Sequence, residues 1–100
     1  MLYVVICTDK SGKLSDREGV RPSHRKYLRK KHKVTVLKAG PTLDSAGKMN
    51  GTVLLVRADE QELVEELIEN DPYSQAGIFK HVDIRPCNMV DIKSNDLLES

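Results

Sequence analysis

Two side chains in this sequence, one imidazole and one carboxylate, are of the types that move protons in enzymes. His24 lies in the stretch VRPSHRKYL at 20–28, and Asp71 lies before Pro72 in ENDPYSQAG at 69–77. A carboxylate that accepts a hydrogen bond from one imidazole nitrogen fixes the tautomer and leaves the other nitrogen as an acceptor. Such a pair without an obvious nucleophile beside it suits isomerisation, elimination or hydration.

Each of the two residues also has a plain structural interpretation. Asp-Pro is an ordinary way to end a helix, because proline disfavours helical geometry in the residue before it. His24 shares a helical face with Tyr27 and Leu28, so it can be a half-buried histidine that hydrogen-bonds to the backbone. We expect His24 in the first turn of a helix that begins near Pro22, where the helix dipole disfavours positive charge and favours a neutral imidazole.

Two polar neighbours extend the candidate site. Arg21 lies one helical turn before His24 and can hold an acidic substrate group such as a carboxylate or phenolate. It can equally pair with Asp71 or Glu18, and the sequence leaves these alternatives open. Ser74 is close to Asp71 in the chain, but nothing marks it as a nucleophile.

The composition indicates one soluble globular domain, which we place at 1–92 with a frayed tail at 93–100. The 100 residues are 39% hydrophobic and 31% charged, with a net charge of +1. The N-terminal apolar run 2–7 is too short for a signal peptide core or a membrane span, so we expect a cytoplasmic protein without a membrane partner.

No pattern in the sequence predicts a metal or a cofactor. The two cysteines, Cys7 and Cys87, form no CxxC motif, no Cys/His cluster has zinc spacing, and we expect free thiols. Neither GxxxxGK[ST] nor GxGxxG occurs, so the glycines are expected in turns.

Charge is distributed unevenly along the chain. Residues 25–33 (RKYLRKKHK) hold six Lys and Arg, whereas 59–71 is acidic and contains no base. The basic side chains fall on several sides of the predicted helix and lack an aromatic platform. We therefore expect a solvated face there and no nucleic-acid partner.

Apolar and turn patterns predict four strands and two helices. We expect strands at 2–7, 34–39, 52–58 and 78–85, and helices at 22–33 and 59–70. The second strand should end at Gly40-Pro41, and Asp59 should cap the second helix. Gly19 and Pro22 predict only a short turn at 15–20 before the first helix, with an unbroken helix kinked at Pro22 as the alternative.

The order β-α-β-β-α-β is the split βαβ, or ferredoxin-like, pattern of the α+β class. It predicts one antiparallel sheet with two helices on one face. The other face needs cover, and a homodimer that stacks two sheets would supply it. The first and last strands are then antiparallel neighbours, so residues near 21–24 and 71–74 should meet at one edge of the sheet. A loop between AGP at 39–41 and NGT at 50–52 could overhang this edge.

Four motifs in order, at 20–28, 39–41, 50–52 and 71–79, resemble the YciI-like (YCII-related) family over about residues 1–90. The resemblance implies a ferredoxin-like homodimer of the dimeric α/β-barrel type, with His24, Asp71 and Arg21 at the positions of the family's site. One activity in that family is dehydrochlorination of a chlorinated hydroxyquinol. We predict that Arg21, Tyr73, Ser74 and Gly51, which lie in these motifs, bind the substrate.

The leading hypothesis is a small-molecule enzyme in which His24 and Asp71 transfer protons in a lyase or isomerase step on an anionic or cyclic substrate. The alternative is a non-catalytic metabolite-binding or regulatory module with the same pocket. The two differ in one observation, since only the enzyme forms a product.

Overall fold

The computed structural model describes residues 1–92, and the tail at 93–100 lies outside the described residues. The elements, in chain order, are β1 (Leu2–Asp9), α1 (Leu14–Leu28), β2 (Thr35–Leu43), β3 (Met49–Arg57), α2 (Gln61–Glu69), α3 (Pro72–Gln75) and β4 (Phe79–Cys87). Except for the short helix α3, this is the predicted order of elements.

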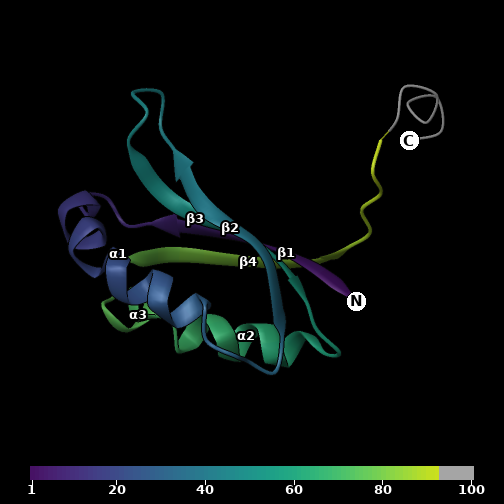
Figure 1. The fold of residues 1–100 in the computed structure, drawn as a ribbon. Helices are drawn as coiled ribbons and strands as arrows, with labels where there is room; N and C mark the ends of the chain where they lie inside the picture. The colour runs from purple at the N-terminus through teal and green to yellow at the C-terminus, as the bar shows by residue number, and fades with distance from the viewer. Residues whose placement is uncertain (93–100) are drawn as a thin grey trace.

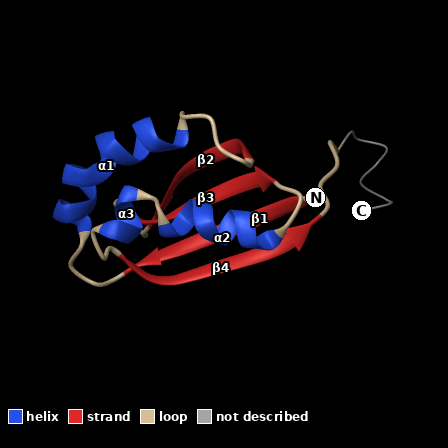
Figure 2. Cartoon of the chain, turned by 90° about the horizontal axis from the view of Figure 1, so that it is seen from below, coloured by secondary structure: helices blue, strands red, loops and turns tan. Residues whose placement is uncertain are grey.

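The four strands form one antiparallel sheet in the order β2-β3-β1-β4. All three helices lie on one side of the sheet, and the turn between β2 and β3 projects away from them (Figure 1). Figure 2 shows the helices laid over the sheet as a separate layer. The ferredoxin-like α+β prediction is confirmed.

The hydrophobic core lies between the sheet and α2. Alternate residues of the two central strands point toward the helices, as the period of two in a strand requires. The buried members are Tyr3, Val5 and Cys7 from β1, Leu54 and Val56 from β3, Val64, Leu67 and Ile68 from α2, and Val34 and Ala58 at the ends of neighbouring loops. Because β1 and β3 lie at the centre of the sheet, they hold the site described below on a rigid base.

Helix α1 differs from the main prediction at both ends. It begins at Leu14 and runs unbroken through Pro22, which was the alternative left open, and it ends at Leu28, well before residue 33. Proline inside a helix removes one hydrogen bond and crowds the preceding turn. Buried contacts made by Arg17 before the proline and by His24 after it hold both halves of the helix against the sheet and α3.

Two smaller boundary predictions are also wrong. Strand β2 continues through Gly40-Pro41 to Leu43. It is an edge strand, where a missing backbone N–H is tolerated. Glu60, and not Asp59, is the N-cap of α2, and its side chain makes no capping hydrogen bond.

Within residues 1–92, none of the helices has both the length and the apolar character needed to cross a membrane. Cys7 and Cys87 are both free thiols, as expected.

Candidate active site

The side chains of His24 and Asp71 meet where α1 packs against α3. Nδ1 of His24 lies 2.9 Å from Oδ1 and 2.8 Å from Oδ2 of Asp71. Both side chains are almost fully excluded from solvent, at 9% and 2% exposed. The strand order predicted this meeting, because it places the end of β1 beside the start of β4 in the sheet.

Asp71 is fixed by the backbone around it. It is the N-cap of α3, its Oδ1 accepts a hydrogen bond of 2.9 Å from the backbone N–H of Tyr73, and Pro72 follows at the first helical position. These are the preferred residue types at both positions. The turn that ends α2 therefore aims the carboxylate at α1, and Asp71 serves both as a cap and as the partner of the imidazole.

His24 does not lie in a first helical turn, as was expected. Since α1 runs from Leu14 to Leu28, His24 lies in the C-terminal half of the helix, and the argument from the N-terminal end of the dipole does not apply to it. Its ring is positioned by two contacts: the Asp71 carboxylate on Nδ1 and the ring of Tyr73, which stacks on the imidazole with 4.0 Å between centroids and 21° between planes.

The ring of Tyr73 contacts both the imidazole of His24 and the guanidinium of Arg17. The guanidinium of Arg17 lies 4.3 Å from the ring centroid, within the range of a cation–π contact. Burial raises the pKa of the Tyr73 phenol, although the nearby charges of Arg17 and Arg21 act to lower it. The phenol thus keeps its proton at neutral pH, and the ring is held by Arg17 as well as by His24.

Arg17 is the largest fully buried side chain in the described part of the chain, at 1% exposed. Its Nε and a terminal nitrogen donate to the two oxygens of Asp9, at 2.7 and 2.9 Å, and the terminal nitrogen also donates to Oγ1 of Thr52 at 2.7 Å. Burial would lower the pKa of this guanidinium, but hydrogen bonding to Asp9 and the charge of Asp9 outweigh it and raise the pKa. A bidentate pair of this kind is rigid.

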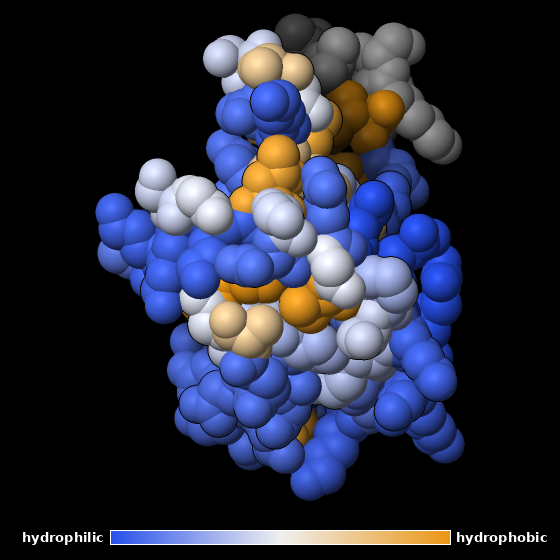
Figure 3. Space-filling model, turned by 90° about the vertical axis from the view of Figure 1, so that its left-hand side faces the viewer, coloured by the Kyte–Doolittle hydropathy of each residue, from blue (hydrophilic) through white to orange (hydrophobic). Residues whose placement is uncertain are grey.

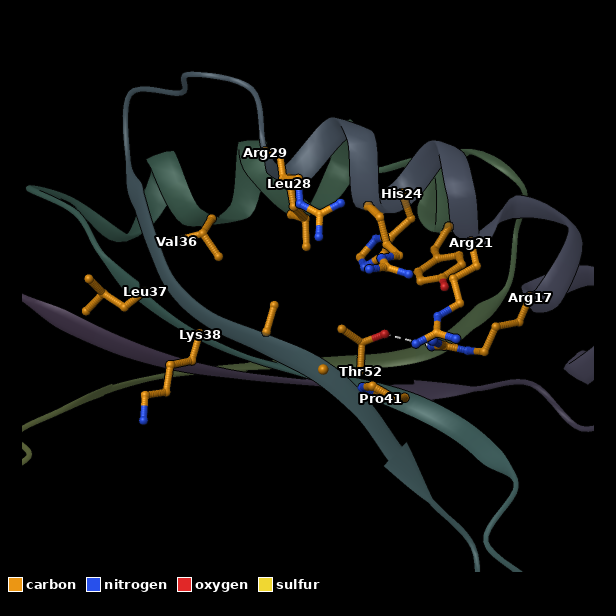
Figure 4. A pocket seen from close by; sticks show the side chains of 14 residues that line it. Arg17, Arg21, His24, Leu28, Arg29, Val36, Leu37, Lys38, Pro41 and Thr52 are labelled. Carbon is orange, nitrogen blue, oxygen red and sulfur yellow. Dashed lines mark hydrogen bonds between the residues drawn. The ribbon is translucent and has the colours of Figure 1, made fainter.

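A cavity of about 350 Å³ lies between α1 and the edge formed by β2 and β3. The residues that line it are Arg17, Arg21, His24, Arg25, Leu28, Arg29, Val36, Leu37, Lys38, Ala39, Gly40, Pro41, Thr52 and Tyr73. Figure 4 shows Arg21 and His24 reaching down from the helix above Thr52. Cavities of this size hold small molecules.

The other predicted substrate-binding residues divide into two groups. Arg21 and Tyr73 line the cavity with His24, but Ser74 does not: it borders a separate hollow with Ile68 and Val82. Gly51 is also absent from the cavity lining. A Cβ there would collide with the carbonyl of Cys7 and the hydroxyl of Thr42, so this glycine permits close approach of the strands.

Sequence reasoning missed Arg17, Asp9 and Thr52. The spacing of Arg17, Arg21 and His24 places all three on one face of a helix, which is a usable signal. The expected break at Gly19 and Pro22 hides this spacing, because it would put Arg17 on a different element from Arg21 and His24.

Within residues 1–92, His, Cys, Asp and Glu side chains form no group of three that could hold a metal ion. The side chains that line the cavity instead carry positive charge and hydrogen-bond donors, which suit an anionic molecule.

Comparison with known proteins places the chain in a family. The model of the YCII-related domain matches residues 1–88. This chain belongs to the YCII-related family. It is 33% identical over 97 residues to Protein YciI of Escherichia coli O6:H1 and to Protein YciI of Shigella flexneri, and each match covers 90% of this chain and 99% of the relative.

A solved structure with a similar fold has a named activity. It is 5-chloro-2-hydroxyhydroquinone dehydrochlorinase from Burkholderia phenoliruptrix AC1100, in complex with 2,5-dihydroxybenzoquinone. The two chains are 27% identical with a TM-score of 0.78, and the match covers 88% of this YCII-related chain and 94% of the other.

Proposed function

We propose that this protein is an enzyme that transfers a proton on a small anionic molecule, in a lyase or isomerase step. The observation that carries the proposal is the pair of contacts, 2.9 and 2.8 Å, between Nδ1 of His24 and the buried carboxylate of Asp71. His24, one member of the pair, lines a cavity, and neither member belongs to the hydrophobic core cluster.

The direction of the hydrogen bond determines what His24 can do. An ionised carboxylate only accepts, so Nδ1 carries the proton, and in the neutral ring Nε2 has a free lone pair. Nε2 has no hydrogen-bond partner within residues 1–92. Every buried side-chain nitrogen in that range has a partner, so Nε2 is not buried. Because His24 lines the cavity, Nε2 is reachable from it. His24 is therefore arranged as a general base whose positive form Asp71 would stabilise.

In an elimination, Nε2 would take a proton from the substrate while the leaving group departs with its bonding electron pair. In an isomerisation, the same nitrogen would return the proton to a second carbon. Negative charge develops on the substrate in both cases, and the guanidinium of Arg21 at the cavity wall would stabilise it. Arg17 and Tyr73 keep the imidazole in place.

The dehydrochlorinase of similar fold suggests a first substrate to try. 5-Chloro-2-hydroxyhydroquinone is cyclic, acidic and able to lose HCl, and the proton-transfer groups described above suit this reaction. We propose hydroxylated aromatic or quinonoid molecules as the substrate class.

A homodimer belongs to the same proposal. The face of the sheet opposite the helices carries apolar side chains, among them Ile6, 44% exposed, and Val53, 36% exposed. In Figure 3 the helix layer at the bottom is almost entirely hydrophilic, while apolar patches lie above it, toward the hairpin of β2 and β3. Stacking two such faces would bury this surface and complete two hydrophobic cores.

The test is turnover of 5-chloro-2-hydroxyhydroquinone, followed by chloride release. We expect His24→Asn to lower kcat by about 10² to 10⁴, the usual contribution of general acid–base catalysis, and to keep the protein folded because Asn still donates to Asp71. His32→Asn is the matched control, since His32 binds the carbonyl of Tyr27 away from the cavity.

Equal turnover by wild type and His24→Asn would refute the proposal. Binding of 2,5-dihydroxybenzoquinone without conversion of any substrate tried would instead favour the non-catalytic module.

A further inference from the structure

The cavity continues beyond the proposed proton-transfer site along a row of arginines. Arg17, Arg21 and Arg25 follow each other at intervals of four residues on α1, Arg29 follows at the same interval as its C-cap, and all four line the same cavity. Residues four apart on a helix lie on the same side, so the row follows the helix axis. The separation from Arg21 to Arg29 is about 12 Å at 1.5 Å per residue.

The arginines in this row have different partners. Arg17 is held by Asp9, whereas Arg21, Arg25 and Arg29 form no ion pair with any carboxylate within residues 1–92. No Asp or Glu occurs among the fourteen residues that line the cavity. Like charges at this spacing repel one another, so an anion bound between them would relieve the repulsion.

Apolar side chains also line the cavity near Arg29, at the far end of the row. Leu28 and Val36 line the cavity on the side of Arg29 that is away from Arg17 and Arg21 (Figure 4). Arg29 is five residues beyond His24, which corresponds to about 7.5 Å along the helix. The cavity therefore offers a reactive end at His24 and a second cationic end at Arg29, with the apolar side chains of Leu28 and Val36 in its wall.

Lys38 does not belong to this cationic end. Although it borders the cavity, its side chain points away from α1, on the other side of β2 (Figure 4). Its partner in the sheet is Leu55, on the face opposite the helices.

We propose that Arg25 and Arg29 form a second anion-binding subsite, and that the substrate is a dianion with two acidic groups separated by an apolar spacer. One acidic group lies at Arg21 beside the reacting carbon, and the other, a carboxylate or a phosphate, is held at Arg25 and Arg29. The arginine fork matches both kinds of oxyanion. This inference rests on the proposed function, because it assigns the substrate class of the same site.

The experiment compares binding of three small acids by calorimetry at physiological salt: hexanoate with one acidic group, adipate with two carboxylates, and 5-phosphonopentanoate with one carboxylate and one phosphonate. We expect the two dianions to bind roughly tenfold more tightly than hexanoate, as one charge-assisted contact predicts. The tighter of the two dianions identifies the group that the subsite prefers.

The variants test whether the gain arises at this subsite. Arg29→Gln should remove roughly tenfold of dianion affinity and leave hexanoate binding unchanged. Lys30→Gln and Lys38→Gln are charge-matched controls: Lys30 is the next residue but lies outside the cavity lining, and Lys38 points away. All three side chains are exposed, so the substitutions do not threaten the fold.

Equal affinity for the three acids, no binding of any of them, or equal losses in Arg29→Gln and Lys30→Gln would overturn the subsite. Failure of the proposed function has a different signature. Binding of the dianions that depends on Arg29, together with turnover that is unaffected by His24→Asn, would refute the proton-transfer proposal and leave the subsite standing.

Discussion

The two long helices pack on the same sheet but bury opposite kinds of side chain. The buried residues of α2 are Val64, Leu67 and Ile68, whereas those of α1 are Arg17 and His24. Helix α2 is held by the hydrophobic effect, which is strong and indifferent to orientation. Helix α1 is held by directional contacts to Asp9, Thr52 and Asp71. The difference teaches that one helix is held by apolar burial and the other by polar contacts that fix where its side chains lie.

The largest expected effect concerns the buried ion pair of α1. Arg17→Met removes the partner of Asp9 and leaves a carboxylate that is 6% exposed without its cation, which should cost about 3–5 kcal/mol of unfolding free energy. Urea denaturation measures it. Arg85→Met is the matched control, since Arg85 and Asp83 form a pair at 2.9 Å with side chains 73% and 52% exposed. We expect the control to cost less than about 1 kcal/mol.

Equal costs for the two arginine variants would contradict the account of α1. A second readout tests positioning: because Arg17 contacts the ring that stacks on His24, Arg17→Met should also lower kcat among the molecules that remain folded.

The next effect concerns α2, where we expect a loss of stability without a loss of kcat. Leu67→Ala removes a core side chain that is 4% exposed, and it should cost about 2–5 kcal/mol of stability. The kcat per folded molecule should stay unchanged, because Leu67 does not line the cavity. Leu43→Ala, at an apolar residue that is 57% exposed, is the control and should change stability little. Loss of activity beyond the unfolded fraction would show that the two helices are not separate in function.

The smallest expected effect concerns the thiol of Cys7, a buried residue of β1. Burial raises the pKa of this thiol from its ordinary 9.0 to about 12, and the charge of Asp71 adds to the shift. The folded state thus keeps the proton longer than the unfolded state, so stability is full below pH 9 and falls as pH rises from 9 to about 12.

The loss should be about 1 kcal/mol at pH 10, measured as the difference in urea stability between pH 8 and pH 10. Cys7→Ala should reduce this difference by the same amount, and subtraction removes the contribution of tyrosines, since burial also raises the pKa of Tyr27 and Tyr73. Identical pH profiles for wild type and Cys7→Ala would exclude the thiol as the cause.

Much of this arrangement could be predicted because it depends on apolar pattern and strand order. The runs in β1 and β3 fix the centre of the sheet, and the order of elements then brings His24 toward Asp71. What could not be predicted depends on tertiary contacts that override local preference. Pro22 and Gly19 favour a break in α1, and only contacts on both sides of the proline keep the helix whole.

The same cause explains the missed residues. Arg17 joins the site only if α1 is continuous, and its partner Asp9 lies at the end of a strand that was expected to stop at residue 7. Likewise, β2 continues past Pro41 because it is an edge strand, a position that no local pattern reveals. Ser74 was drawn into the prediction by its closeness to Asp71 in sequence, but α3 turns it toward another surface.

The most direct test of the central claim is the tautomer of His24, read from the nitrogen chemical shifts of its ring by NMR at a pH where the ring is neutral. The account predicts a proton on Nδ1 and a bare Nε2 in the wild type, and a mixture of tautomers in Asp71→Asn. That variant isolates the effect, because Asn is also a good N-cap and should keep α3 in place. A proton on Nε2 in the wild type, or the same tautomer in both proteins, would contradict the claim that Asp71 prepares His24 to accept a proton.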